Sequence, residues 1–358
     1  MTAKELVAAL EKEKRLDPDG YRSLLECRDP ESVAYLHGTA REAAARRFGH
    51  GIYIRGLIEI SNICRNDCLY CGIRKGNGNI RRYLMTPEEI LGRCSAGYRA
   101  GFRTFVLQGG ELPDEADSLI EEVCRLIRLG FPDCAITLSL GERKEEAYRH
   151  FFKAGATRYL LRHETHDPRH YSRLHPPEMS LRNRLRCLGV LKDIGYQTGT
   201  GIMVGSPCQT MANITDDILY ISSLKPEMIG LGPFIPHKDT TFAGFSPLPD
   251  RRLELTLKLI SIFRLIFPDA LIPATTALAT IAEDGCEQGI LSGANVVMPN
   301  LSPPEVRDSY SLYDNKACSG SESAEGLGEL EARLERIGYH IDFSRGDYQS
   351  TSSGSVQS

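Results

Sequence analysis

The sequence has no tryptophan, no long apolar run and no strong excess of charge of either sign. Without an apolar run of about 18 residues, no transmembrane span is expected. A formal net charge of −4 gives no overall basic field that would favour nucleic acid as a partner. Residues 1–16 are charged and lack the apolar core of a signal peptide. We therefore expect a cytoplasmic protein that binds neither nucleic acid nor membrane.

Disulfide patterning is also missing, although the chain contains 11 cysteines. The number is odd and the spacing uneven, unlike the framework of a small secreted protein. In a reducing compartment these residues should be thiols or metal ligands. Hydrophobic residues make up 41% and charged residues 25% of the 358 residues, which is ordinary for a globular protein with a large core.

From about residue 52, short apolar runs alternate with amphipathic stretches, which predicts βα units and a parallel sheet. The predicted strands are 53–60, 104–107, 135–139, 158–161, 198–204, 228–231, 271–274 and 295–298. The predicted helices between them are 87–100, 115–129, 143–154, 180–194, 213–224, 250–266 and 282–291. Eight strands with seven intervening helices indicate an α/β fold, a complete (βα)8 TIM-type barrel.

The composition divides the chain into three parts. Residues 1–50 are predicted to form an N-terminal helical extension, and residues 51–317 the barrel. Residues 318–358 are predicted to contain a C-terminal helix at 325–337 and a disordered tail.

Three cysteines follow the first predicted strand with the spacing C-x3-C-x2-C: Cys64, Cys68 and Cys71. Three thiolates on one short loop can converge on one metal site. A 4Fe–4S cluster usually takes four cysteines, so three leave one iron open for a ligand that is not protein. The alternative is a structural zinc site completed by a fourth ligand from elsewhere in the fold.

Two further patterns lie at the carboxyl ends of predicted strands, where barrel active sites are found. The sequence Gln108-Gly109-Gly110-Glu111 contains two glycines that allow the backbone to approach a ligand closely. Arg158 and Arg162 are four residues apart on a strand, so their side chains share a face. If that face is the lumen, their charge requires an anionic ligand or internal acids such as Glu59 or Glu164.

Together these motifs resemble the radical S-adenosylmethionine (SAM) family. In that family SAM chelates the open iron and is cleaved to methionine and a 5′-deoxyadenosyl radical. The resemblance implies that Cys64, Cys68 and Cys71 hold the cluster and carry the catalysis. It implies that SAM is contacted by Tyr70, Gln108, Gly109, Gly110, Glu111, Glu164, Arg184 and Met203.

Nine segments between about residues 50 and 315, including IRGLIEISNICRNDCLYCGIR, VLQGGE, ITLSLGE and GANVVMPN, resemble the HydE group of iron-iron hydrogenase maturases. This resemblance implies a cavity in which the radical adenosylates an anionic iron–cysteine complex carrying CO and cyanide. A ferredoxin or flavodoxin as electron donor and other maturases are the implied partners. Candidate substrate contacts are Arg55, Arg158, Arg162, Thr275, Thr276, Asn300, Tyr310 and Tyr313.

The threonine pair and the tyrosine pair among these candidates have more specific expected roles. The Thr275 and Thr276 hydroxyls either donate to an anion or are satisfied by neighbouring backbone. Tyr310 and Tyr313 are expected to close the bottom of the barrel.

The chain departs from many members of this group near its C-terminus, where three further cysteines often bind an auxiliary iron–sulfur cluster. Only Cys318 is present there, so no auxiliary cluster is predicted. Cys208 lies on the expected rim, and Cys94, Cys124 and Cys187 are expected to be buried small hydrophobic residues.

Three alternatives remain open. A lysine mutase of the methylornithine synthase type should have acids in its cavity for the substrate ammonium. Biotin synthase needs a second cluster inside the barrel, for which Cys134 and Cys187 are too few. A non-catalytic iron–sulfur scaffold or electron carrier would not need the SAM-type motifs.

Overall fold

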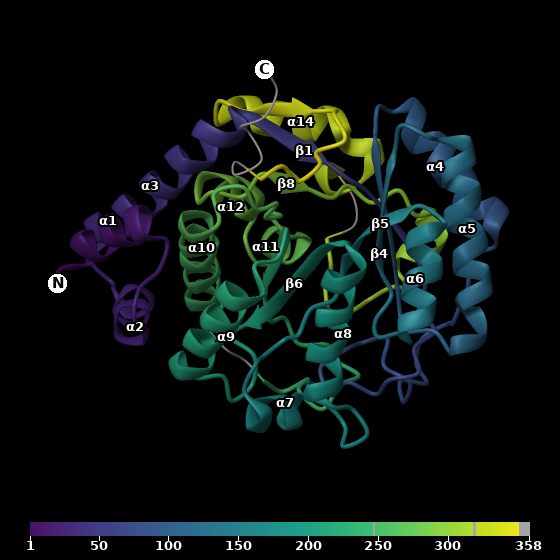
Figure 1. Ribbon diagram of the computed structural model, residues 1–358, viewed down its shortest axis with the longest axis horizontal. Helices are drawn as coiled ribbons and strands as arrows, with labels where there is room; N and C mark the ends of the chain where they lie inside the picture. Colours follow the sequence, from purple (N-terminus) through teal and green to yellow (C-terminus); the bar gives the residue numbers. More distant parts are fainter. Residues whose placement is uncertain (246–247, 318–319, 351–358) are drawn as a thin grey trace.

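The computed structural model describes residues 1–245, 248–317 and 320–350. The chain begins with three helices, and each follows a threonine or aspartate whose side chain accepts from a backbone N–H three residues on. These helices are α1 (Ala3–Glu13), α2 (Pro18–Glu26) and α3 (Pro30–Phe48). α3 packs against α10 at the edge of the sheet (Figure 1).

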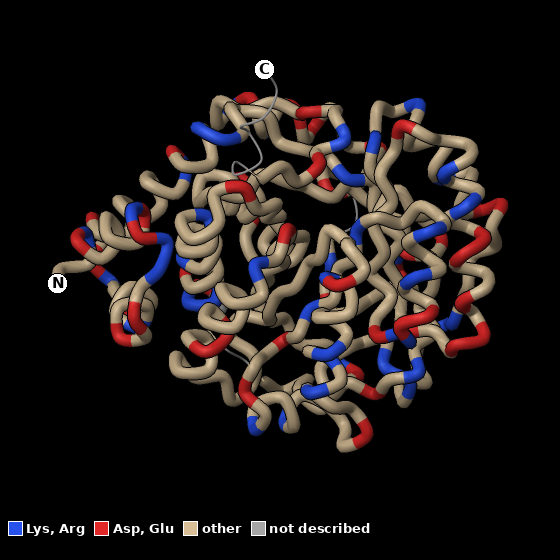
Figure 2. Tube along the Cα trace, viewed as in Figure 1, with Lys and Arg blue, Asp and Glu red and all other residues tan. Residues whose placement is uncertain are grey.

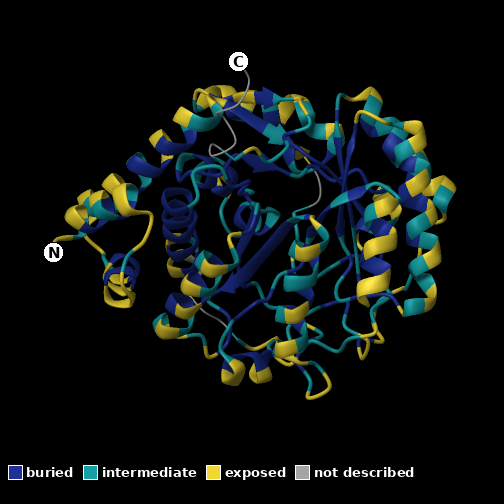
Figure 3. Cartoon of the chain, viewed as in Figure 1, coloured by how far each residue is buried: buried dark blue, intermediate teal, exposed yellow. Residues whose placement is uncertain are grey.

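A six-stranded parallel sheet forms the centre of the molecule, in the strand order β2-β3-β4-β5-β6-β7. Its strands are β2 (Gly56–Ser61), β3 (Thr104–Gly109), β4 (Ala135–Ser139), β5 (Ala156–Leu160), β6 (Gln197–Val204) and β7 (Met228–Pro233). The strands are almost wholly buried, whereas the helices around them expose one side to solvent (Figure 3). This burial explains why the strands read as continuous apolar runs.

Helices cover the outer face of the curled sheet (Figure 1). The helices in contact with these strands are α4 (Pro87–Arg99), α5 (Asp117–Gly130), α6 (Glu145–Lys153), α8 (Leu181–Ile194), α9 (Met211–Leu224), α10 (Pro249–Ile266) and α11 (Thr276–Ile281). Three further helices are α7 (Pro168–Leu174), α12 (Gly285–Leu291) and α13 (Pro304–Arg307). Within the described ranges, no helix is long and apolar enough to cross a membrane.

Two of the eight predicted strands differ from the structure. The predicted strand 53–60 is two strands, because the chain changes partners at Arg55: β1 (Gly51–Ile54) pairs with β8 (Val296–Val297) and β9 (His340–Asp342) instead of joining the six-stranded sheet. The predicted strand 271–274 makes only isolated parallel bridges, from Leu271 to Met228 and from Pro273 to Val296. The structure therefore has an α/β fold with a curled half-barrel of six parallel strands.

The C-terminal part returns to the sheet after α14 (Leu327–Arg336), which lies within the predicted helix. After β9, residues 343–350 run beneath the amino ends of the strands. Thr104 Oγ1, at the start of β3, donates to the Arg345 carbonyl at 2.8 Å. Gln197, at the start of β6, accepts from the Tyr348 N–H at 3.4 Å. Cys318 and residues 351–358 lie outside the described residues.

One pair of glycines fixes how closely β6 and β7 approach. Gly201 and Gly230 are direct partners in the register. A Cβ on Gly201 would lie 1.8 Å from the Gly230 carbonyl oxygen, whereas a Cβ on Gly230 would have no atom nearer than 3.8 Å. The first substitution must therefore push two central strands apart.

We expect Gly201→Ala to lower the free energy of unfolding by about 3 kcal/mol, since overpacking a buried site costs about 1–3 kcal/mol and backbone adapts poorly. Gly230→Ala is the matched control and should change it by less than about 1 kcal/mol. Urea denaturation of both variants measures the difference. Equal effects of the two substitutions would contradict the described packing.

Candidate active site

The three predicted cluster ligands lie on the segment that links β2 to α4, and their side chains are half-buried. Burial raises the pKa of the Cys71 thiol to about 12, and the charge of Cys64 adds to this effect. Burial likewise raises the pKa of Cys68, with further contributions from Cys71 and Cys64. The three thiols are therefore near enough to affect one another's charge, and metal binding must displace their protons.

Arg82 ties this loop together from within. Its guanidinium donates to the carbonyls of residues 62, 73, 74 and 77, at distances from 2.6 to 3.0 Å. Its positive charge also lowers the pKa of Cys64 and Cys71, against the larger effect of burial. The same side chain thus holds the loop in shape and favours the thiolate form that metal binding requires.

The glycine motif packs directly on the cysteine loop. The Gly110 N–H donates to the Ser61 carbonyl at 3.0 Å. A Cβ on Gly110 would lie 2.3 Å from the Ile63 carbonyl oxygen and 2.9 Å from Cys64 Cβ. Only glycine fits this close approach, so the end of β3 and the first cysteine are held in contact.

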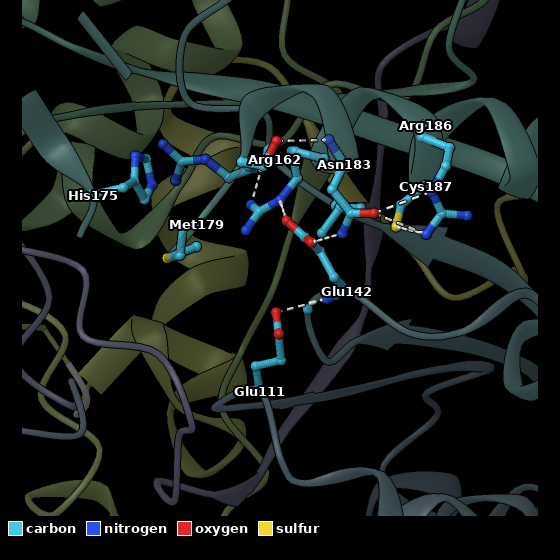
Figure 4. A network of polar contacts seen from close by, with 12 residues as sticks. Glu111, Glu142, Arg162, His175, Met179, Asn183, Arg186 and Cys187 are labelled. Atoms are coloured by element: carbon cyan, nitrogen blue, oxygen red, sulfur yellow. Dashed lines mark hydrogen bonds and ion pairs between the residues drawn. The ribbon is translucent and has the colours of Figure 1, made fainter. Parts of the chain in front are cut away.

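Glu142 connects two predicted SAM contacts, Glu111 and Arg184, through its backbone N–H and its carboxylate. Glu111 and Glu142 are labelled in Figure 4. The Arg184 Nε donates to Glu142 Oε1 at 2.5 Å, and the Glu142 N–H donates to Glu111 Oε2 at 2.7 Å. Arg65 Nε donates to the other oxygen of Glu111 at 2.8 Å. Burial disfavours the charge of Arg184, but Glu142, with further contributions from Tyr171 and Glu111, outweighs burial and raises the pKa of the guanidinium well above its ordinary value.

Glu164 and Arg162 extend the same network at the end of β5. Glu164 is buried and has a left-handed φ of 67°, and its N–H donates to the Gly201 carbonyl at 3.1 Å. Arg162 Nη2 donates to Glu164 Oε2 at 2.9 Å, and the Arg162 carbonyl accepts from Arg184 at 2.7 Å. Four of the predicted site residues are therefore linked to one another directly or through Glu142.

Tyr70 and Met203, which come from separate parts of the chain, lie in one apolar cluster. The other members of this cluster are Leu174, Phe234, Phe242 and Phe245. The Tyr70 ring meets the His175 ring edge-on, with centroids 5.4 Å apart. This surface next to the cysteine loop suits a flat aromatic ring such as adenine.

The two remaining arginines of the predicted substrate set lie at the opposite, amino end of the sheet. Arg158 is fully buried and donates to Asp347 Oδ1 at 2.5 Å, Thr104 Oγ1 at 3.2 Å and the carbonyls of 345 and 346. The internal-pairing alternative therefore holds for Arg158, with Asp347 as the acid. Arg55 contacts Met228 Sδ at 3.3 Å, and burial together with the charge of Arg158 lowers its pKa well below the ordinary value.

Two predicted tyrosines are placed differently from the expectation. The segment that carries them runs over the carboxyl ends of the strands, because Gly72 N donates to the Leu312 carbonyl at 2.9 Å and Asn62 Nδ2 to the Ser309 carbonyl at 2.7 Å. Tyr310 and Tyr313 therefore lie on the side of the cysteine loop. The prediction that they close the bottom is wrong, since residues 343–350 occupy that end.

The other predicted substrate contacts have protein partners. Thr275 Oγ1 donates to the Leu231 carbonyl at 3.0 Å, as the backbone alternative predicts. Thr276 begins α11, and its hydroxyl interacts with Glu322. Asn300 Nδ2 donates to Glu59 Oε2 at 3.0 Å.

The donor set fits an iron–sulfur cluster better than a single ion. In the ranges 1–245, 248–317 and 320–350, no group of three or more histidine, cysteine, aspartate or glutamate side chains is arranged to hold one metal ion. A zinc site needs four ligands around one point, whereas a cluster spreads its thiolates around several irons. The cysteine loop supplies three thiols, which is one ligand fewer than a structural zinc ion needs and the number that leaves one iron of a 4Fe–4S cluster open.

Comparison with known proteins bears on the same residues. The model of the radical SAM superfamily matches residues 58–221, which include the three cysteines, Glu111 and Arg184. Over 325 residues, the chain is 41% identical to the [FeFe] hydrogenase maturase subunit HydE of Thermotoga maritima, covering 89% of each sequence. The chain belongs to the HydE family of radical SAM enzymes. The superfamily's chemistry uses a 4Fe–4S cluster and SAM.

More distant relatives share the fold. The 3-methylornithine synthase of Methanosarcina acetivorans is 29% identical over 329 residues, covering 90% of each sequence. The crystal structure of methylornithine synthase (PylB) superposes with a TM-score of 0.82 at 26% identity, covering 94% of this chain and 97% of that one. The maturase HydG from Carboxydothermus hydrogenoformans has a TM-score of 0.80 at 20% identity, covering 95% of this chain and 79% of that one, which shows the fold alone.

Two residues of this HydE-family site were not singled out from the sequence, Arg82 and Glu142. Both lie in segments that carried the resemblance, RRYLMTPEEI and ITLSLGE. Glu142 follows the end of β4 by three residues, which is the position where a barrel presents functional groups. Its position after β4 could therefore have identified Glu142 as a candidate site residue from the sequence.

Glu142 holds Arg184, which the resemblance assigns to SAM, so we expect Glu142→Gln to weaken SAM binding. Loss of a hydrogen bond between charged groups costs about 1.5–3 kcal/mol, which corresponds to a rise in the KM for SAM of about tenfold or more. The kcat should change much less, because Arg184 remains present. Formation of 5′-deoxyadenosine at varied SAM concentration measures both constants.

Glu145→Gln is the matched control, since among the residues that the structure describes Glu145 pairs only with the exposed Arg149 on α6. This variant should leave the KM for SAM unchanged. A KM that stays the same in Glu142→Gln would show that Arg184 does not depend on Glu142.

Proposed function

We propose that this HydE-family enzyme cleaves SAM reductively at one 4Fe–4S cluster held by Cys64, Cys68 and Cys71. The radical would act on an anionic iron–cysteine complex during assembly of the [FeFe] hydrogenase active site. The observation that carries this proposal is the similarity to HydE over 89% of the chain, together with the contact of the cysteine loop with Gly110 and the position of Arg184 near Cys68. When bound, the cluster supplies the electron and the open iron at which SAM is chelated and cleaved.

The protein's own residues would orient SAM and exclude water. Arg184, held by Glu142, is placed to meet the SAM carboxylate, and Glu164 to accept from its ribose or amine. Tyr70 and Met203 offer an apolar surface to the adenine. Because these groups are fixed by one another, little reorganisation is needed when SAM binds.

Unsatisfied arginine atoms support an anionic substrate. Among the described residues, Arg55 Nε and Nη2 and Arg162 Nε are buried without a hydrogen-bond partner. A buried cationic donor without a partner is costly unless a ligand completes it. We propose that the substrate cavity lies between these two arginines, with Thr275, Thr276, Asn300, Tyr310 and Tyr313 around its upper part and Arg158 holding its floor.

The charges inside the sheet argue against the lysine mutase alternative. Glu59 is fully buried on β2, but its carboxylate is paired with Lys316 and accepts from Asn300. Glu164 is paired with Arg162. These two acids are therefore already neutralised and offer little to a substrate ammonium.

We also propose that the half-barrel closes into a complete (βα)8 barrel, with 1–50 as an extension, 51–317 as the barrel and 318–358 as the C-terminal part. Backbone hydrogen bonds support the closure. Ile229 N donates to the Leu271 carbonyl at 3.1 Å and Asn295 N to the Ile272 carbonyl at 2.9 Å, and Leu57 N donates to the Pro299 carbonyl at 3.0 Å.

We propose a single cluster, because Cys318 is the only cysteine in the C-terminal region where many relatives have three cysteines that bind an auxiliary cluster. Anaerobically reconstituted protein should contain about four iron atoms per chain. About eight would overturn the single-cluster proposal without affecting the assignment to the family.

The function is tested by in vitro maturation of an [FeFe] hydrogenase apoprotein in a mixture from which HydE is left out. Adding this protein should restore hydrogen production. No hydrogen production, with protein that cleaves SAM, would contradict the maturase role. Reduced ferredoxin or flavodoxin and the other maturases would be the partners in that reaction.

A further inference from the structure

A groove on the outer surface leads to the cysteine loop. It lies between α7, the start of α8 and the loop that joins them, and has a volume of about 600 Å3. Its floor is largely apolar and is formed by Pro168, Tyr171, Pro176, Pro177, Met179, Leu181 and Leu185. No predicted SAM or substrate contact lines it.

Met179 connects the groove to the predicted cluster. It is a lining residue of the groove, and its Sδ lies 3.5 Å from Cys68 Sγ. One half-exposed side chain therefore spans from the surface to a cluster ligand. Close, continuous contact of this kind is what the transfer of an electron from outside requires.

The charges around the groove are mainly positive. Arg169 and Arg173 on α7 and Arg182 and Arg186 on α8 are exposed and make no ion pair within the part of the chain that the structure describes. Basic positions accordingly mark α7 and the lower end of α8 in Figure 2. The acids nearby are Glu178 on the joining loop, Asp167 at the start of α7, and Asp216, which lines the groove and pairs with His166.

We propose that this groove docks the electron donor, an acidic one-electron carrier protein of the flavodoxin type. The proposal rests on the proposed function, which requires a reductant. An apolar floor with a basic rim matches an acidic partner whose redox group is exposed within an apolar patch. The donor's reduced flavin would supply one electron to the cluster that Cys64, Cys68 and Cys71 would hold, and no bond would form or break.

Binding is the first test, with oxidised flavodoxin as the probe and reconstituted protein at low salt. Arg169→Glu combined with Arg182→Glu should raise the Kd at least tenfold and flatten its dependence on salt. Both residues lie in first turns of helices, where glutamate is favourable, so the fold should tolerate the change. Glu178→Lys should lower the Kd.

The matched control reverses two exposed arginines elsewhere, Arg125→Glu with Arg336→Glu on α5 and α14. Its Kd should stay within about twofold of the wild-type value, because only charge near the groove should matter. An unchanged Kd in the α7–α8 variant, an equal rise in the control, or no binding to the wild type would overturn the proposal. An unchanged Kd in the α7–α8 variant would mean that the flavodoxin binds elsewhere and that the groove does not dock it.

Electron delivery is the second test. With reduced flavodoxin, the α7–α8 variant should form 5′-deoxyadenosine at least tenfold more slowly than the wild type, whereas with dithionite the two rates should agree within about twofold. Equal rates with flavodoxin would overturn the proposal. If the wild type forms no product with dithionite, the proposed function fails, while the binding result still decides whether the groove docks an acidic protein.

Discussion

Cys68→Ser is expected to abolish SAM cleavage. A serine hydroxyl is a poor ligand for iron, and a loop with two thiolates cannot hold a cluster that needs three. The reconstituted variant should retain far less than the four iron atoms per chain expected of the wild type and form no detectable 5′-deoxyadenosine. Iron analysis and product chromatography after reduction with dithionite measure both effects.

Cys208→Ser is the control for this experiment. Cys208 is exposed on the loop after β6, where its sulfur lies 3.2 Å from Arg173 Nη1. Cys208 is not one of the three proposed cluster ligands, so the iron content and the rate of SAM cleavage of this variant should equal those of the wild type. Wild-type iron and cleavage in Cys68→Ser would contradict the ligand assignment.

Asp347→Ala is expected to cause a large loss of stability, because it removes the counter-charge of a buried arginine. Removing this carboxylate leaves the Arg158 guanidinium buried without its counter-charge and next to a second buried arginine, Arg55. Breaking a buried ion pair by removing one partner costs about 3–5 kcal/mol. Since the Asp347 side chain is 29% exposed, we expect about 3 kcal/mol in urea denaturation.

Arg345→Ala is the matched control, because Arg345 binds the other oxygen of Asp347 at 2.7 Å but is 41% exposed. Its loss should cost less than about 1 kcal/mol. Similar losses in the two variants would contradict the buried pair as the source of stability.

The pH dependence of the free energy of unfolding provides a second test of the Arg158–Asp347 ion pair. Burial opposes the charge of Asp347, but hydrogen bonds from Arg345 and Arg158 outweigh it and lower the pKa of the carboxyl. The stabilisation is therefore complete above the unfolded pKa of about 3.9 and is lost as the pH falls through the lower folded value. The stability difference between the wild type and Asp347→Asn should be constant near neutral pH and shrink below about pH 4.

The parts of the site that are local in sequence were predictable. The cysteine loop, the Gly-Gly pair and the strands that carry them depend on neighbouring residues, and the apolar runs located six central strands. Arg184 and Glu164 could be named through family resemblance alone, because nothing in their own surroundings distinguishes them from ordinary charges at helix rims.

The contacts between distant segments were not predictable. The run 53–60 contains Arg55, Gly56 and Glu59 among its apolar residues, but its composition does not distinguish two short strands from one long strand, so the change of sheet at Arg55 was not predictable. Asp347 lies just before a polar tail and reads as solvent-exposed, although it reaches Arg158 across 189 positions. The position of Tyr310 likewise depends on Asn62 and Gly72, which are far away in the sequence.

The measurement that tests the central claim most directly compares two substrates in one assay. Reconstituted wild-type protein is reduced with dithionite in the presence of SAM and either the iron–cysteine complex carrying CO and cyanide or lysine. The account predicts 5′-deoxyadenosyl transfer to the iron–cysteine complex and no methylornithine from lysine. Methylornithine formation, or intact SAM with a full complement of iron, would contradict it.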